Sequence, residues 1–425
     1  MSKISTIYIP HNKNTMNSAT VKMPEPERIF IPMAMSANVS SEIAVKEGEY
    51  VLKGQKIGKA THPLASPIYS SVSGAVVSVS DFLMPYDIKT KIVEIESDGL
   101  DKSVDFKPPI INSREKLLEA VFESGVVGLG GAAFPTHVKL NSTDIKTLIV
   151  NVAECEPYIT VDYRAVLEDF EDILFGVNHI KRFCNIERVI FAVESNKPKA
   201  IEILKEKFES EICILKSRYP QGAEKITIYQ ATGKILPEGM RPYEIGVVVL
   251  NVTTIAKLGH FFSTGEPLIS KRITVDGPCV KKPQNLEVLI GTRISDILDF
   301  IGLNKSVKKL ILGGPMMGVS VDDIDFPILK ATNAILAFDE KTAQHPYTTP
   351  CIRCGRCYRA CPFHLMPAEF ERRYYSGDVE SLKALHIASC IECGICSYVC
   401  PAKRDLVSTN RLAKNLVKNQ QRKKQ

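Results

Sequence analysis

Eight cysteines in the last fifth of the chain carry the clearest chemistry of this sequence. They form two runs, CIRCGRCYRACP at 351–362 and CIECGICSYVCP at 390–401, and both runs read C-x2-C-x2-C-x3-C-P. Bacterial ferredoxins hold [4Fe–4S] clusters with this spacing, because three thiolates of a run wrap one cluster and the fourth ligates the other. We therefore expect one cluster on Cys351, Cys354, Cys357 and Cys400, and a second on Cys361, Cys390, Cys393 and Cys396.

Zinc is the alternative for these cysteines. Zinc sites use C-x2-C pairs with longer gaps and often include histidine, so two matching runs that end in Cys-Pro favour iron–sulfur clusters. Two clusters also indicate that the protein relays electrons, since a single cluster would suffice for a purely structural role. The other four cysteines are scattered along the chain. Reduced cysteines together with clusters favour the cytoplasm.

A glycine-rich segment, GLGGAAFPTHVKL at 128–140, is a second candidate site. Gly128, Gly130 and Gly131 let backbone N–H groups approach a ligand, and Lys139 adds a cation for phosphate. The dinucleotide fingerprint lies between a strand and a helix, whereas a predicted helix precedes this loop. Taken alone, the segment is better explained as a tight glycine turn under a helix.

An acidic segment, NVAECEPYITVDYR at 151–164, follows a predicted buried strand. Open α/β sheets bind ligands at the carboxyl ends of their strands. Near a flavin, Glu154 and Glu156 would bind the ribose hydroxyls or the carboxamide of a nicotinamide. A helix-capping acidic loop is the alternative interpretation.

The elements that position these residues change in type along the chain. Residues 28–97 read as short strands between glycine turns, and they are similar to the two halves of a barrel-sandwich hybrid, as in biotinyl carriers. Beyond residue 113, a helix near 114–125 and helices such as 164–182 alternate with buried strands. The strands, expected at 147–152, 188–193 and 245–252, indicate a mainly parallel sheet. Short strands with a small helix return over 261–338, and a proline-containing linker at 344–350 leads to the cysteine runs.

The order of these segments resembles a known family. SGVVGLGGAAFPTHVKL followed by NVAECEPYITVDYR is similar to the FMN- and NADH-binding subunit of respiratory complex I. With the barrel-sandwich, LILGGPMMG at 310–318 and the twin cysteine runs, residues 28–407 resemble the RnfC family, the NADH-side subunit of Rnf ion-translocating complexes.

The resemblance implies specific cofactor contacts. FMN would be bound by Gly128, Gly130, Lys139, Asn151, Asn251 and Thr254. Phe134 would lie against the nicotinamide, and Glu156 would bind NADH. The segment YPQGAEK at 219–225 would bring Gly222 to FMN and Glu224 to the nucleotide. The chain departs from the complex I pattern at Leu129, Ala153 and Ala223, where the complex I protein has an arginine and two acidic residues.

The resemblance also implies a multidomain α/β and α+β protein in five parts. We expect a barrel-sandwich hybrid at 1–105, an FMN/NADH-binding α/β domain at 106–260 and a β-grasp, SLBB-like domain at 261–340. A two-cluster ferredoxin-like domain would follow at 341–407, and a basic tail at 408–425. Residues 401–425 hold eight Lys or Arg residues against Asp405 alone. A helix at 405–419 with one partly apolar face would attach such a tail to membrane partners or an anionic surface.

These features predict an electron-transferring oxidoreductase with FMN, two [4Fe–4S] clusters and NAD(H) as substrate. Hydride transfer would take place at FMN, so we assign no catalytic side chain. Partners would be the other subunits of a membrane-bound Rnf complex, with ferredoxin a further candidate, and the location would be the cytoplasmic face of the membrane. An RnfC-like soluble NADH-dependent reductase, such as a cobalamin reductase or a donor to an amino-acid reductase, is one alternative. An iron–sulfur scaffold with a decayed flavin site is another. No nucleic-acid motif is present, and the longest apolar runs are far shorter than the roughly 18 residues of a membrane span.

Overall fold

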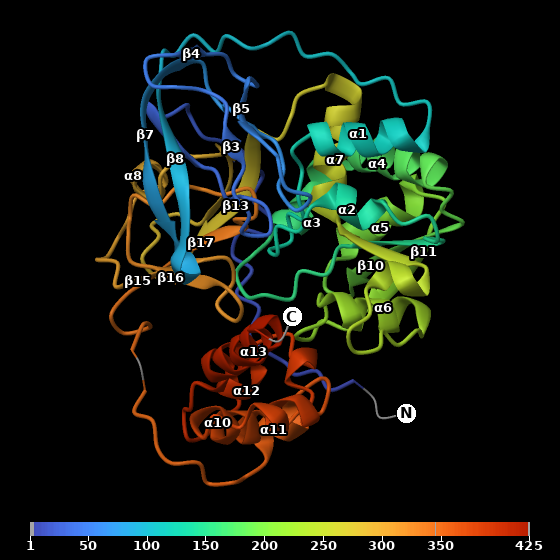
Figure 1. The fold of residues 1–425 in the computed structure, drawn as a ribbon, viewed down its shortest axis with the longest axis vertical. Coiled ribbons are helices and arrows are strands. Elements are labelled where there is room, and N and C mark those ends of the chain that lie inside the picture. Colours follow the sequence, from blue (N-terminus) through green and yellow to red (C-terminus); the bar gives the residue numbers. More distant parts are fainter. Residues whose placement is uncertain (1–3, 345, 424–425) are drawn as a thin grey trace.

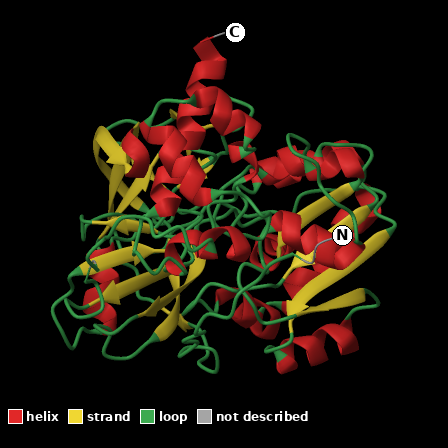
Figure 2. Ribbon diagram, turned by 90° about the horizontal axis from the view of Figure 1, so that it is seen from below, coloured by secondary structure: helices red, strands yellow, loops and turns green. Residues whose placement is uncertain are grey.

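The computed structural model describes residues 4–344 and 346–423 of the 425-residue chain. Figure 1 shows the barrel-like strands and the helix-covered sheet side by side, with the cysteine-rich helices below them. Figure 2 shows the strands in two groups, on either side of a zone of loops and helices.

The amino-terminal β-domain consists of two antiparallel sheets. One has the order β2-β8-β7-β4 and the other β3-β5-β6. Alternation along β2 buries Ile29 and Ile31 against Val93 and Ile95 of β8, which gives the sandwich its core. The strands are β2 (Arg28–Pro32), β3 (Glu42–Ile43), β4 (Tyr50–Val51), β5 (Lys56–Lys59), β6 (Ile68–Tyr69), β7 (Gly74–Met84) and β8 (Ile88–Ser97), and the 3₁₀ turn η1 (Pro85–Asp87) joins the last two.

The second domain contains the expected parallel sheet. Its order is β11-β10-β9-β12, and every neighbouring pair is parallel. The residues at 148–150 are fully buried, as a sheet covered on both faces requires. The strands are β9 (Thr147–Asn151), β10 (Arg188–Glu194), β11 (Glu211–Leu215) and β12 (Val247–Asn251).

The helices of this domain are α1 (Arg114–Glu123), α2 (Thr136–Leu140), α3 (Val161–Glu168), α4 (Phe170–Phe183), α5 (Pro198–Lys207), α6 (Glu224–Thr232) and α7 (Val252–Thr264), with the 3₁₀ turn η2 (Pro242–Ile245). The single helix expected at 164–182 is in fact two helices. They separate at Asp169, whose carboxylate oxygens accept hydrogen bonds of 2.7 and 3.0 Å from Arg272 of the next domain.

The third domain is a mixed sheet of order β1-β14-β13-β17-β15-β16 with helix α8 (Ile294–Ile301). Its first strand comes from the amino-terminal segment and pairs in parallel with β14. Residues 21–22 thus belong to this sheet, although we expected them in the first domain. The strands are β1 (Val21–Lys22), β13 (Ser270–Asp276), β14 (Gln284–Leu289), β15 (Lys309–Leu312), β16 (Val319–Val321) and β17 (Ala334–Phe338).

The cysteine-rich domain is helical. It contains α9 (Arg356–Ala360), α10 (Pro367–Tyr375), α11 (Val379–Ala384), η3 (Ile387–Ser389), α12 (Ile395–Tyr398) and α13 (Leu406–Lys423). Ala413 and Val417 of α13 pack with Phe370 and Leu382 in one buried cluster. The segment 408–425, which we expected as a separate basic tail, is therefore part of this domain's core as far as Val417.

Candidate flavin and iron–sulfur sites

The carboxyl edge of the parallel sheet gathers four of the predicted FMN residues. Asn151 and Asn251 end β9 and β12 and face each other in register. The Asn251 side chain caps α7 by accepting from Thr254 N at 3.2 Å. The Asn151 amide donates to the Gly222 carbonyl at 2.9 Å. A Cβ on Gly222 would lie 2.8 Å from the Ala153 carbonyl, so only glycine allows this approach.

The glycine loop lies over the same edge. Leu129 N donates to Thr254 Oγ1 at 2.9 Å, and the buried Lys271 of β13 donates to the Leu129 carbonyl at 3.2 Å. Burial lowers the pKa of Lys271 to about 7. Within the described residues, the N–H groups of Gly130 and Gly131 have no protein acceptor. These two donors are available to a bound anion or carbonyl group, as a cofactor loop requires.

Three other predicted residues border this loop. Phe134 is half-buried, and its carbonyl accepts from Gly128 N at 2.8 Å. Lys139 Nζ forms a 2.7 Å ion pair with Glu224 and donates to the Val249 carbonyl at 3.2 Å. The predicted phosphate cation and the predicted nucleotide contact therefore bind each other. Both side chains keep some exposure, 27% and 39%, and so remain accessible to a ligand.

Glu154 does not fit the ligand role that we expected for it. Its carboxylate is only 3% exposed and lies 3.1 Å from Nζ of the fully buried Lys197. It also accepts from Asp162 N at 2.8 Å. Because burying a carboxylate is costly unless it is paired, these partners tie Glu154 to the interior. We therefore reassign it from ligand binding to support of the acidic loop.

The backbone of the acidic loop is held by Lys13, a residue that the sequence did not single out. Its ammonium donates to the carbonyls of Glu154 at 2.7 Å and Glu156 at 2.8 Å, and also to that of Ile159. Burial lowers the pKa of Lys13 to about 8. A lone lysine in a polar segment has no periodicity or spacing that would have indicated this role.

Glu156 lies where three domains meet. Its carboxylate accepts from Met316 N at 3.1 Å, in the Gly-Gly-Pro-Met-Met loop of the third domain. Gly314 touches it so closely that a Cβ there would be 2.1 Å from Oε2. Burial raises the pKa of Glu156 to about 7. The carboxyl group therefore changes charge near neutral pH, which suits a group that contacts a ligand.

Tyr219 connects Glu156 to the cysteine-rich domain. Its hydroxyl lies 3.4 Å from Glu156 Oε1 and donates to the carbonyl of Cys393 at 2.8 Å. Cys155, Tyr219, Cys393 and Ile395 belong to one buried apolar cluster. The acidic segment and the second cysteine run thus pack against each other through buried apolar side chains.

The four cysteines predicted for the second cluster line one cavity. Cys361, at the end of α9, is brought across to Cys390, Cys393 and Cys396 of the second run, as cross-ligation requires. Burial raises the pKa of the Cys393 thiol to about 12, so the charge of bound iron is needed to keep its thiolate. The buried Asn410 amide of α13 lies 3.9 Å from Sγ of both Cys390 and Cys396.

The two chain segments that carry the cysteines predicted for the first cluster also contact each other. Thr349 N donates to the Ala402 carbonyl at 3.1 Å, and Thr348 Oγ1 donates to the Lys403 carbonyl at 3.2 Å. These bonds hold the residues just before Cys351 against those just after Cys400. In the described part of the chain, no three His, Cys, Asp or Glu side chains converge as a single metal ion would require. Cubane ligands are more widely spaced, since each thiolate binds a different iron. The four cysteines of the second set share one cavity, and the assignment of the first set stays a prediction.

Among the described residues, no helix is both long enough and apolar enough to cross a bilayer.

Four family models match the chain in the order of its domains. They are the RnfC barrel sandwich hybrid domain at 4–100, the Nuo51 FMN-binding domain at 121–260, the SLBB domain at 272–320 and the 4Fe-4S dicluster domain at 350–404. These matches confirm the predicted fold classes and support FMN and iron–sulfur clusters as cofactors.

The solved structure of an NAD+-reducing [NiFe]-hydrogenase has a similar fold. It matches with a TM-score of 0.51 and 18% identity, over 72% of this chain and 62% of that chain. At this identity, the likeness concerns the fold alone.

Curated relatives match most of the chain. A subunit of the proton-translocating ferredoxin:NAD(+) oxidoreductase complex of Clostridium ljungdahlii is 39% identical over 84% of this chain and 80% of its own length. The corresponding subunit of the Na(+)-translocating complex of Acetobacterium woodii is 37% identical over 98% and 97%. That of the ion-translocating oxidoreductase complex of Rhodobacter capsulatus is 38% identical over 97% and 82%. This chain therefore belongs to the RnfC family, whose members are subunits of ion-translocating oxidoreductase complexes.

Proposed function

We propose that this chain is the peripheral electron-transfer subunit of an Rnf-type ferredoxin:NAD complex, and that it passes electrons between NAD(H), FMN and two [4Fe–4S] clusters. FMN, when bound, exchanges a hydride with nicotinamide and single electrons with the clusters. The names of the relatives favour a role within a complex over a free-standing reductase. The free donors of the glycine loop speak against a scaffold with a decayed flavin site.

One observation carries the proposal. The Tyr219 hydroxyl joins Glu156 of the candidate nicotinamide site to Cys393 of the second cysteine run. The contact lies in a buried apolar cluster, a surrounding that disfavours water. Apolar packing of this kind would keep a flavin and a cluster close together and shield them from solvent.

The side chains at the site divide the remaining work. Asn151, Asn251 and the donors of Gly130 and Gly131 would orient the flavin. Glu156, held by Met316 N, would accept a hydrogen bond from a ribose hydroxyl or the carboxamide of NADH. Lys13 and Lys271 fix the backbone carbonyls of the loops that present these groups.

The test is anaerobic purification of the full chain. We expect bound FMN, about eight iron and eight sulfide, and bleaching of both flavin and cluster absorbance on addition of NADH. A colourless protein loaded with zinc would rule out the cluster assignment. A protein with clusters that neither takes up flavin nor responds to NADH would point to the scaffold.

Membrane attachment on the cytoplasmic face belongs to this proposal. It is supported by the family's complex names and by cysteines that need reducing conditions. Cell fractionation, with and without the other subunits, tests it: we expect the chain in the membrane fraction only when those subunits are present.

A further inference from the structure

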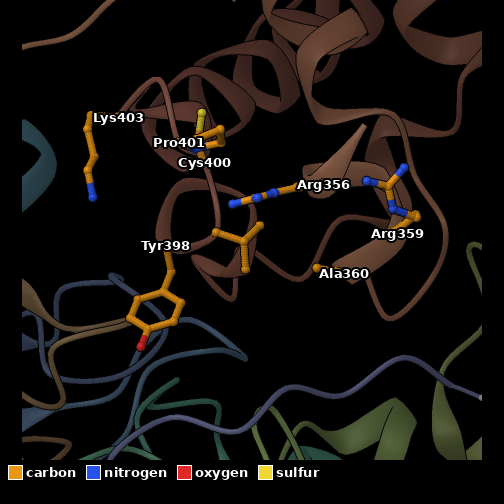
Figure 3. Close-up of a pocket in the computed structure, with 8 residues that line it drawn as sticks. Arg356, Arg359, Ala360, Tyr398, Cys400, Pro401 and Lys403 are labelled. Atoms are coloured by element: carbon orange, nitrogen blue, oxygen red, sulfur yellow. The ribbon is translucent and has the colours of Figure 1, made fainter. Parts of the chain in front are cut away.

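An open hollow of about 550 Å³ lies beside Cys400, at the edge of the predicted first cluster. Figure 3 shows the side chains around it, with Arg356 and Arg359 from α9, and Tyr398 and Lys403 on either side of Cys400. Its charged lining is entirely basic. Neither the flavin site nor the cluster ligands account for these cations.

These cations differ from the other basic residues of the domain. Arg404 pairs with Glu371 at 2.7 Å, and Lys414 pairs with Glu392 at 2.6 Å. By contrast, Arg356, Arg359 and Lys403 have no acidic side chain within ion-pair distance among the residues whose side chains are described (4–344 and 346–420). All three are exposed. Unpaired like charges at one place create a positive potential that attracts an anionic surface.

Besides Cys400, which lines the hollow, two more of the cysteines predicted for the first cluster are accessible. Cys351 and Cys354 are exposed, whereas Cys393 and Cys396 of the second run are buried. Tyr398, which lines the hollow, is 51% exposed, and in the first cysteine run Ile352 is 66% exposed and Tyr358 47%. Exposed Arg and Tyr beside apolar groups are the residues that dominate protein–protein interfaces.

We propose that this face docks an acidic protein surface that carries the next redox centre, so that electrons enter or leave the chain at the first cluster. This inference rests on the proposed function. Charge complementarity selects an acidic partner, and the exposed cysteines select one that exchanges electrons. An anionic lipid surface would be attracted by the same cations, but it would give no reason for the thiolate edge to face outward.

The experiment uses two charge-reversal pairs in the full chain. The test pair is Arg356→Glu with Lys403→Glu. The control pair is Lys199→Glu with Lys282→Glu, which are exposed lysines on other domains. The binding probe is the remaining subunits of the complex, purified together in detergent. Affinity is measured at roughly 50 mM and 500 mM salt, since screening at high salt removes attraction between exposed charges.

We expect the test pair to bind the subunits about tenfold more weakly than the native chain at low salt, and the difference to vanish at high salt. The control pair should bind like the native chain. A test pair that binds normally at low salt overturns the proposal. So does normal binding to the subunits combined with lost binding to vesicles of anionic lipid, which would assign the face to the membrane.

Two further measurements distinguish a loss of binding from a loss of folding. Iron content and NADH-dependent dye reduction of each isolated variant show whether the domain is intact. Where the reversed charges reduce iron content, Arg356→Gln with Lys403→Gln replaces them, and we expect a smaller loss of the same salt-dependent kind. A native chain that binds its partners through this face but shows no response to NADH would refute the proposed function and leave the docking face in place.

Discussion

The pH dependence of Glu156→Gln tests the assignment of the nicotinamide site. Burial holds the pKa of Glu156 near 7 in the folded chain, against an ordinary value of 4.5. At pH 8 the native carboxylate is ionised and would accept strongly from a ligand hydroxyl or amide. At pH 6 it is mostly protonated. The glutamine variant should therefore resemble the native protein at pH 6 and differ from it at pH 8.

The magnitudes follow from the same shift. A hydrogen bond to a charged group is worth about 1 kcal/mol more than one to a neutral amide, so kcat/KM for NADH should fall roughly fivefold at pH 8. Stability should change in the opposite direction. Because the folded pKa is the higher one, the native chain loses stability as pH rises from 4.5 through 7, by at most about 3 kcal/mol. The variant has no such loss, so it should be the more stable protein at pH 8.

Rapid mixing of NADH with the oxidised protein from pH 5.5 to 9 measures the first effect, and thermal unfolding over the same range measures the second. Glu187→Gln, at an exposed position, is the control. Flavin content after gel filtration should be the same in all three proteins. Equal loss of flavin and of NADH use at both pH values would mean that Glu156 is structural. An unchanged rate at pH 8 would refute its contact with NADH.

Four other changes test the remaining assignments. Cys354→Ala should remove one cluster and lower iron from about eight to about four; full iron content would contradict its role as a ligand. Asn410→Leu should make the potential of the second cluster more negative, because its amide hydrogen bonds to two sulfurs are lost; redox titration followed by EPR measures this, and an unchanged potential would exclude the contact. Lys13→Met should leave three carbonyls without their donor, which lowers the free energy of unfolding by several kcal/mol at about 1–3 kcal/mol for each carbonyl. Denaturant unfolding measures this decrease, and KM for NADH should rise while iron content stays constant. Truncation after Asp405 should destabilise the cysteine-rich domain and reduce its iron, because α13 supplies buried Ala413 and Val417. We had expected the tail helix only to attach the chain to its partners. A truncated chain that keeps its full iron content would support that earlier expectation.

The residues with close sequence spacing were the predictable part. Four cysteines within eleven positions constrain one another through short loops, so their spacing alone indicates a cluster. The buried strands were equally visible, since a sheet covered on both faces needs continuous apolar runs. The break between α3 and α4 was not visible, because Asp169 is fixed there by Arg272, about a hundred positions away.

The candidate flavin site was predictable only in part. The glycine loop and the acidic segment were found because their residues are adjacent in the sequence. Within the acidic segment, nothing local distinguishes Glu154 from Glu156, and both were predicted as ligands. Their surroundings separate them: Lys197 ties one to the interior, while Met316 N and Tyr219 hold the other between three domains.

By itself, therefore, the sequence determined the iron–sulfur chemistry, which follows from the local spacing of the cysteines. The flavin and the order of the domains were predicted from the resemblance of whole segments to a known family. The tertiary structure alone decided which groups support that chemistry. Lys13, Lys271 and Asn410 have ordinary sequence neighbours, and Tyr219 was quoted only as the first residue of the segment 219–225. Each of the four acts on a segment other than its own. The physical reason is that burial and hydrogen bonding depend on which distant segments fold against one another. The same holds for the basic face at the first cluster, where unpaired cations are recognised only once the paired ones are known.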